Sequence, residues 1–98
     1  MGLALNWGLR AKGYQQFAAG SLATAQPLTF PAGCSLALII PEAQAVRWRD
    51  DGTDPTAAVG QPLAVGAELR YDSCSISAFR VIAQTAGAIL NVVYYGNP

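Results

Sequence analysis

The sequence predicts an all-β fold, an antiparallel sandwich of seven or eight short strands, from three observations. The length of 98 residues fits one domain and leaves no room for a second core. Ten glycines and six prolines are spread along the chain, so that few windows could hold three helical turns. The segments between them often alternate apolar and polar residues, which is the period of a half-buried strand. Both a jelly roll and an immunoglobulin-like sandwich fit this pattern.

The first part of the domain contains both weak and strong strand candidates. Residues 15–19 and 22–30 are the weak ones. Residues 35–40 are mostly apolar on both alternating sets of positions, which is typical of a central strand. Residues 45–49 alternate and place Val46 and Trp48 on one face.

The second part continues with a weak strand at residues 63–65 and three stronger ones. Residues 68–72 alternate strictly, so Leu69 and Tyr71 are expected to face the core. Residues 77–83 and 88–95 are the other two strands. The last strand is apolar on both faces except at Asn91. One face carries Leu90, Val92 and Tyr94, and the opposite face carries Ile89, Val93 and Tyr95.

Residues 1–12 have no clear period and are predicted to form an extended arm before a single domain at residues 13–98. The apolar side chains of the arm would be poorly soluble in water, so we expect the arm to lie against its own sandwich or a neighbouring subunit. An ordinary edge strand is the alternative. The apolar residues of the arm are Leu3, Leu5, Trp7 and Leu9.

Charged residues make up only 12% of the chain, against about 25% in a typical soluble domain. Much of the surface is therefore neutral, and such surfaces are usually covered by a partner. The net charge of zero offers no long-range attraction to nucleic acid or to anionic lipid. The second apolar face of the last strand predicts a homo-oligomer interface, unless the arm or a loop of the same chain covers it.

No segment resembles a targeting signal, and the longest apolar stretch, residues 36–40, is too short to cross a bilayer. We therefore expect a soluble protein made in a cytoplasm.

Catalytic and cofactor-binding motifs are missing from the sequence. Without histidine there is no imidazole base and no imidazole metal ligand. Cys34 and Cys74 lack the paired spacing of a zinc site and are predicted to be free thiols. A disulfide between them is the alternative if the fold brings them together. No glycine-rich phosphate loop precedes a helix. We expect no enzymatic activity, no cofactor and no metal.

The densest polar cluster lies between residues 47 and 54. Asp51 and Gly52 form a turn signal, and we expect an arginine to pair with an aspartate and hold the loop, with the Trp48 ring in the core. Calcium binding, stacking of a single-stranded base and a protein contact are the alternatives. The structural loop comprises Arg47, Trp48, Arg49, Asp50, Asp51, Gly52 and Asp54.

The chain from Val46 onward resembles small β-sandwich proteins encoded among the virion genes of tailed phages. About half of the chain takes part, and its motifs are turn glycines, core aromatics and a strand end. The resemblance implies a virion protein of head decoration or cement type, although related sandwiches occur in necks, tails and fibres. The matching elements are Arg-Trp-Arg-Asp-Asp-Gly at 47–52, Pro-Thr at 55–56, Gly-x-Pro-Leu at 60–63, Tyr-Asp at 71–72, Phe-Arg-Val-Ile at 79–82, Leu-Asn-Val at 90–92 and Tyr-Tyr at 94–95.

These observations lead to the expectation of a capsid decoration or cement protein, assembled in the host cytoplasm and located in the virion. It would contact the major capsid protein or other virion proteins and would form a homo-oligomer. We expect no nucleic acid or membrane partner. A neck, tail or fibre module that recognises a host glycan or protein is the alternative.

Overall fold

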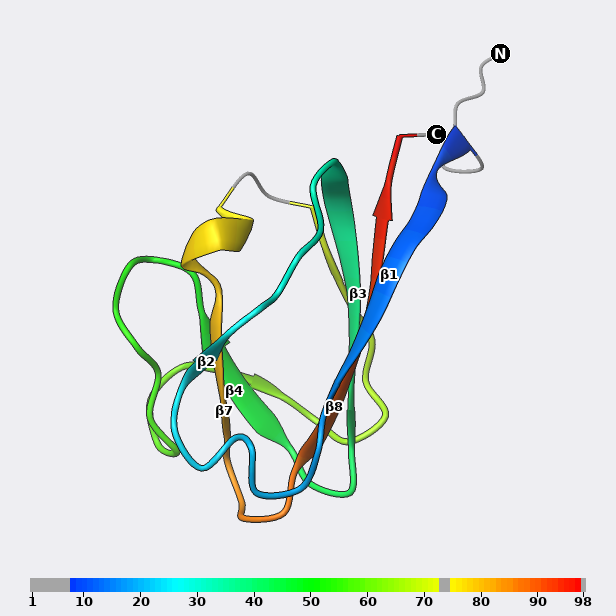
Figure 1. Cartoon of the computed structure of the whole chain (residues 1–98). Helices are drawn as coiled ribbons and strands as arrows, with labels where there is room; N and C mark the ends of the chain where they lie inside the picture. The colour runs from blue at the N-terminus through cyan, green and yellow to red at the C-terminus, as the bar shows by residue number, and fades with distance from the viewer. Residues whose placement is uncertain (1–7, 73–74, 98) are drawn as a thin grey trace.

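The computed structural model describes residues 8–72 and 75–97 and is all-β, with two antiparallel sheets of four strands packed face to face (Figure 1). Among the described residues, Ile76–Ala78 form a 3₁₀ turn, η2. The strands are β1 (Arg10–Phe17), β2 (Gln26–Pro27), β3 (Cys34–Glu42), β4 (Val46–Arg49), β5 (Gln61–Leu63), β6 (Leu69–Tyr71), β7 (Arg80–Ala83) and β8 (Ile89–Gly96).

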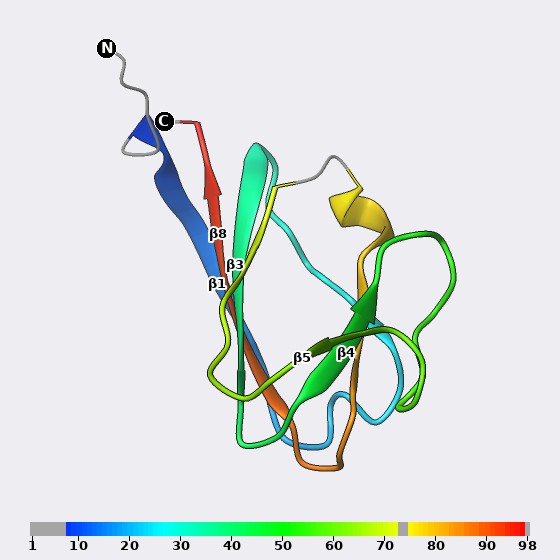
Figure 2. The same ribbon diagram turned by 180° about the vertical axis from the view of Figure 1, so that it is seen from behind.

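The strand order is that of a jelly roll rather than an immunoglobulin-like sandwich. One sheet has the order β1-β8-β3-β6 and the other β2-β7-β4-β5. The first strand therefore pairs with the last, the second with the seventh, the third with the sixth and the fourth with the fifth. This is the pairing of one long hairpin folded over on itself, as in a jelly roll. Figure 2 shows β5 beside β4 in the smaller sheet.

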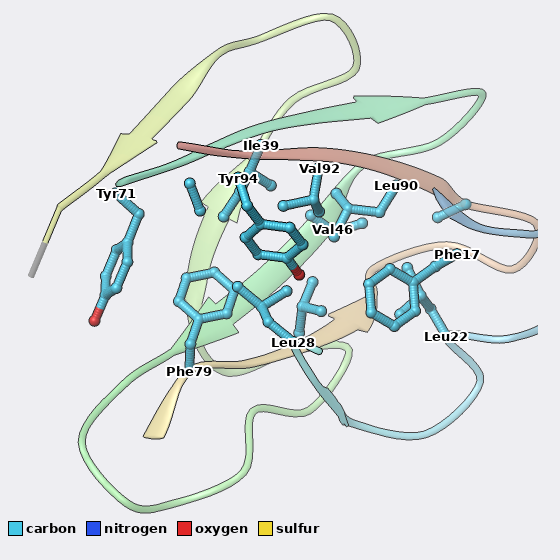
Figure 3. Close-up of a cluster of buried hydrophobic side chains, with 13 residues drawn as sticks. Phe17, Leu22, Leu28, Ile39, Val46, Tyr71, Phe79, Leu90, Val92 and Tyr94 are labelled. Carbon is cyan, nitrogen blue, oxygen red and sulfur yellow. The ribbon is translucent and has the colours of Figure 1, made fainter. Parts of the chain in front are cut away.

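The core lies between the sheets and follows the alternation of the strands (Figure 3). Along β8, the inward Leu90, Val92 and Tyr94 are at most 1% exposed. Cross-strand partners share a face, so Ile39 of β3 points inward beside Val92. The side of the other sheet contributes Phe79, immediately before β7, which is fully buried.

The first and shortest strands differ from their predicted bounds. Residues 10–12, assigned to the arm from the sequence, form the beginning of β1, an edge strand bonded to β8. The weak candidate at 22–30 shrinks to β2, of two residues, and the candidate at 63–65 is shifted by two residues to β5, Gln61–Leu63. Their apolar side chains still reach the core, because Leu22 and Leu28 are buried although they lie outside β2. Burial at these positions is achieved without regular strand pairing.

Candidate functional site

Two surfaces of the jelly roll carry the residues singled out in the sequence. The first, called the outer face below, is the side of the β1-β8-β3-β6 sheet that points away from the core. Register assigns its members, because each pairs across strands with another outward residue. They are Ala11, Tyr14 and Gln16 on β1, Ile89, Asn91, Val93 and Tyr95 on β8, Leu36, Leu38, Ile40 and Glu42 on β3, and Arg70 on β6.

One end of the outer face is polar and internally bonded. The Tyr14 hydroxyl and the Gln16 amide both donate to Asn91 Oδ1, at 2.5 and 2.9 Å. Asn91 Nδ2 in turn donates to Glu42 Oε1 at 2.9 Å. The single polar residue of β8 therefore joins three strands of the sheet across its outer side.

The other end of the outer face is mostly apolar, with Arg70 opposite Leu38. Leu38 pairs with Val93, and Leu36 pairs with Tyr95. Val93, Tyr95 and Leu38 are half-buried in the single chain. No described side chain of the second sheet can reach them, because that sheet packs on the opposite side.

The predicted interface residues separate into two groups. Ile89, Val93 and Tyr95 all lie on the outer face, but Ile89 lies opposite Glu42 at its polar end. Half-buried Leu9 lies beside Leu36 and Tyr95. Leu3, Leu5 and Trp7 lie outside the described residues. Sequence reasoning missed Leu36, Leu38 and Ile40, because a strand apolar on both faces was interpreted as covered on both. The β3 pattern itself, apolar at each outward position from Leu36 to Ile40, was the signal for them.

The second surface is the loop after β4, built around an aromatic cluster. The Trp48 ring stacks on Phe79, with centroids 5.1 Å apart and planes 14° apart. Tyr71 meets both rings edge-on, at 5.9 Å from Trp48 and 4.9 Å from Phe79. Trp48 remains half-buried rather than enclosed, so the ring contributes to the core and also to the surface.

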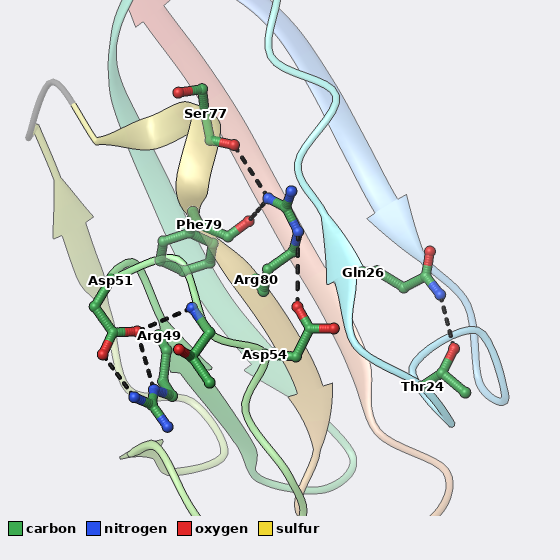
Figure 4. A network of polar contacts seen from close by, with 9 residues as sticks. Thr24, Gln26, Arg49, Asp51, Asp54, Ser77, Phe79 and Arg80 are labelled. Carbon is green, nitrogen blue, oxygen red and sulfur yellow. Dashed lines mark hydrogen bonds and ion pairs between the residues drawn. The ribbon is translucent and has the colours of Figure 1, made fainter.

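Polar contacts fix the shape of this loop (Figure 4). Arg49 donates to both carboxylate oxygens of Asp51, at 3.0 Å from Nε and 2.6 Å from Nη2, one of the pairs expected from the sequence. This hydrogen bond raises the pKa of Arg49 and lowers the pKa of Asp51. Asp54 approaches Arg80 at 4.0 Å, and the Tyr71 hydroxyl donates to Asp50 at 2.6 Å.

Arg47 braces the far side of the loop. Its Nε donates to the carbonyl oxygen of Ala57 at 3.1 Å, and its Nη1 donates to that of Gly60 at 2.9 Å. Gly60 has φ +145°, and a Cβ there would lie 3.1 Å from Pro55 and 3.2 Å from the Trp48 carbonyl oxygen. A glycine is therefore required where the loop passes over the end of β4.

The loop borders a pocket of about 560 Å³ that lies next to the Trp48 ring and is open to solvent. Sequence reasoning missed Val59, Gly60 and Gln61, which no spacing rule connects with the aspartates. The pocket is lined by Trp48, Arg49, Asp50, Asp51, Val59, Gly60 and Gln61.

The described residues offer little else that is reactive. Burial raises the pKa of the Cys34 thiol, which favours its neutral form, and Cys74 lies outside the described residues. Within residues 8–72 and 75–97, no three His, Cys, Asp or Glu side chains gather to hold a metal ion, and Asp50, Asp51 and Asp54 are instead engaged as above. No helix in the described part of the chain is long and apolar enough to span a membrane.

Comparisons of the chain with protein-family models, with curated proteins and with solved structures return no match.

Proposed function

We propose that this chain is a structural virion protein of a tailed bacteriophage, of head decoration or cement type. It would stabilise the shell by self-association and by contacts with the major capsid protein. The observation that carries the proposal is the apolar end of the outer face, around Leu36, Leu38 and Val93. The low charged fraction and the sequence resemblance support it further.

The physical basis is burial of neutral surface. A sheet of a sandwich normally places polar residues on the side that meets water. Val93 and Tyr95 break this rule, so burying them against a neighbour gains about 25 cal/mol per Å² of apolar area before the cost of association. A modest contact repeated over many copies adds up to substantial cohesion of a shell.

Analytical ultracentrifugation of the wild type and of Val93→Glu tests the self-association. A buried, unpaired carboxylate costs several kcal/mol, so this variant should be monomeric where the wild type is oligomeric. Val65→Glu is the matched control, since Val65 is 53% exposed and lies outside the outer face. Circular dichroism checks that both variants fold.

The copy number per virion and the binding of the protein to phage heads test its location in the particle. Quantitative densitometry of purified virions should give hundreds of copies per particle for a shell protein, and six or twelve for a neck or tail protein. A wild type that stays monomeric at high concentration and does not bind capsids would refute the decoration function.

A second candidate function is recognition of a host glycan by a neck, tail or fibre module. The observation that favours it is the pocket beside Trp48, where a partly exposed indole adjoins carboxylates and the Gln61 amide. Its volume of about 560 Å³ falls within the range of small-ligand sites. A glycan array should give signals that Gln61→Ala reduces and Gln84→Ala, an exposed glutamine elsewhere, leaves intact. An array without signals would dismiss this candidate.

A further inference from the structure

The outer face carries one row of side chains whose two ends differ in chemistry. Cross-strand pairing sets four residues side by side, Tyr14 of β1, Val93 of β8, Leu38 of β3 and Arg70 of β6. Neighbouring strands lie about 4.8 Å apart, so the row is about 14 Å long. It has an aromatic ring at one end, a cation at the other end and two aliphatic side chains between them.

Both ends of this row are open to solvent. Tyr14 is 60% exposed, and the hydrogen bond from its hydroxyl to Asn91 restricts the orientation of the ring. Arg70 is also exposed, and within residues 8–72 and 75–97 its guanidinium makes no ion pair. A guanidinium over the face of an aromatic ring is a favourable pair. Because Val93 and Leu38 separate the two ends, this pair forms only between two copies of the chain.

We propose that a second copy of this chain packs face to face on the outer face, about a two-fold axis that runs parallel to the strands between β3 and β8. This axis reverses the order of the row, so Tyr14 of one copy meets Arg70 of the other. Val93 of one copy likewise meets Leu38 of the other, and each contact occurs twice, as in every isologous dimer. The inference rests on the proposed function, because it specifies the geometry of the proposed self-association.

The next row of the outer face supports the same axis. Leu36 pairs with Tyr95 within the chain, so the axis brings Tyr95 of the second copy over Leu36. A hollow of about 130 Å³, lined in part by Leu36, Leu38 and Arg70, lies at this position and has room for part of the incoming ring. The polar end around Asn91 comes to the edge of the contact, where interfaces are normally polar and wet.

The chemistry of the row disfavours the other simple arrangement. A two-fold axis across the strands would place each residue of the row against its own counterpart. Arg70 would then face Arg70 of the second copy, and two guanidinium groups without a counterion repel each other. The two Tyr14 rings would meet without a cation. An axis parallel to the strands replaces both of these contacts with arginine–aromatic pairs.

The size of the face sets the strength of the dimer. Four strands about 4.8 Å apart and six steps of about 3.3 Å along β3 give about 19 by 20 Å, or about 400 Å² per copy. A standard stable interface takes about 800 Å² per partner. The dimer is therefore a weak one, and sedimentation has to extend to about millimolar concentration to measure it.

The test mixes two variants that each dimerise poorly alone. In Tyr14→Arg, the new arginine meets Arg70 of the other copy, and in Arg70→Glu, the new glutamate meets the electron-rich face of the Tyr14 ring. Each variant should associate about fivefold to thirtyfold more weakly than the wild type, because two pairs are lost per dimer. In the mixture, the new arginine meets the new glutamate, and association should return at least to the wild-type strength.

Controls separate this contact from general effects of charge and folding. Arg10→Glu, the same charge change at an exposed position outside the outer face, should leave association unchanged and should not rescue Tyr14→Arg. Circular dichroism checks that the variants fold. If Tyr14→Arg does not fold, Arg70→Met and Tyr14→Phe replace it. Arg70→Met loses the cation and should weaken association about fivefold to thirtyfold, whereas Tyr14→Phe keeps the ring and should weaken it less than about twofold.

The outcomes separate this arrangement from the function on which it rests. A wild type that associates through Val93, without rescue in the mixture, overturns the arrangement and leaves the proposed function standing. Rescue in a protein that does not bind phage heads supports the arrangement and refutes the decoration function. A wild type that stays monomeric at about millimolar concentration overturns the dimer, and if it still binds capsids, the outer face serves a shell protein instead.

Discussion

Phe79 is the residue whose removal should cost the fold most. It is fully buried and touches two aromatic neighbours, stacked on Trp48 at 5.1 Å and edge-on to Tyr71 at 4.9 Å. Truncation of a buried phenylalanine to alanine costs about 3–5 kcal/mol. A domain of this size has a total stability of about 5–15 kcal/mol, so Phe79→Ala should remove a large share of it.

Phe79→Leu separates the aromatic contribution from the loss of volume. Leucine keeps most of the apolar bulk but loses both ring pairs, each worth about 0.5–1.5 kcal/mol. We therefore expect a loss of about 1–3 kcal/mol from this variant. Urea unfolding followed by far-UV circular dichroism measures both variants without relying on the fluorescence of Trp48.

Phe30→Ala is the matched control, because the Phe30 side chain is already 37% exposed. It should cost less than half as much as Phe79→Ala. If the two alanine variants prove equally stable, the aromatic cluster is not the centre of the core and the reasoning from its geometry is refuted.

Three further predictions concern pH, the loop and the thiols. Burial raises the pKa of Tyr94 from 10.0 to about 12, so its contribution to stability is complete below pH 10 and should fall by roughly 2 kcal/mol as pH rises through 12. Urea midpoints across this range should fall less steeply in Tyr94→Phe. Gly60→Ala should cost about 1–3 kcal/mol through strain and contact, and Gly52→Ala, also at positive φ but in open space, should cost less in the same assay. Replacing Cys34 and Cys74 together by serine should cost about 1 kcal/mol or less, and a reducing agent should leave the wild-type melting temperature unchanged; a large drop in either experiment would contradict free thiols.

The strands with strict alternation could be placed from the sequence because one buried face determines their pattern. Leu69 and Tyr71 face the core as expected, and so do Leu90, Val92 and Tyr94. The jelly-roll order could not be derived, since alternation determines which side of a strand is buried but not which strand lies next to it. The bounds of β2 were also beyond reach, because Leu22 and Leu28 are buried from irregular chain that carries no period.

The candidate surfaces were only partly predictable for a related reason. The apolar positions of β8 could be identified one strand at a time, whereas Leu36 and Leu38 join them only through the register of β3. The pocket beside Trp48 depends on Gly60 and Gln61, which follow the aspartates by several positions and return over β4 through the bonds of Arg47. Such long-range placement leaves no local trace in the sequence.

The pairing of β1 with β8 has a consequence for how the chain acquires its fold during synthesis. Among the described strands, the sole partner of β1 is β8, whose residues are synthesised about eighty positions later. Until then, β1 has no hydrogen-bonding partner in its sheet, and β3 has only β6 beside it. Sheets that depend on such distant pairing fold slowly, in milliseconds to seconds. The nascent chain should therefore stay sensitive to proteases until β8 emerges, and then become resistant in a single late step.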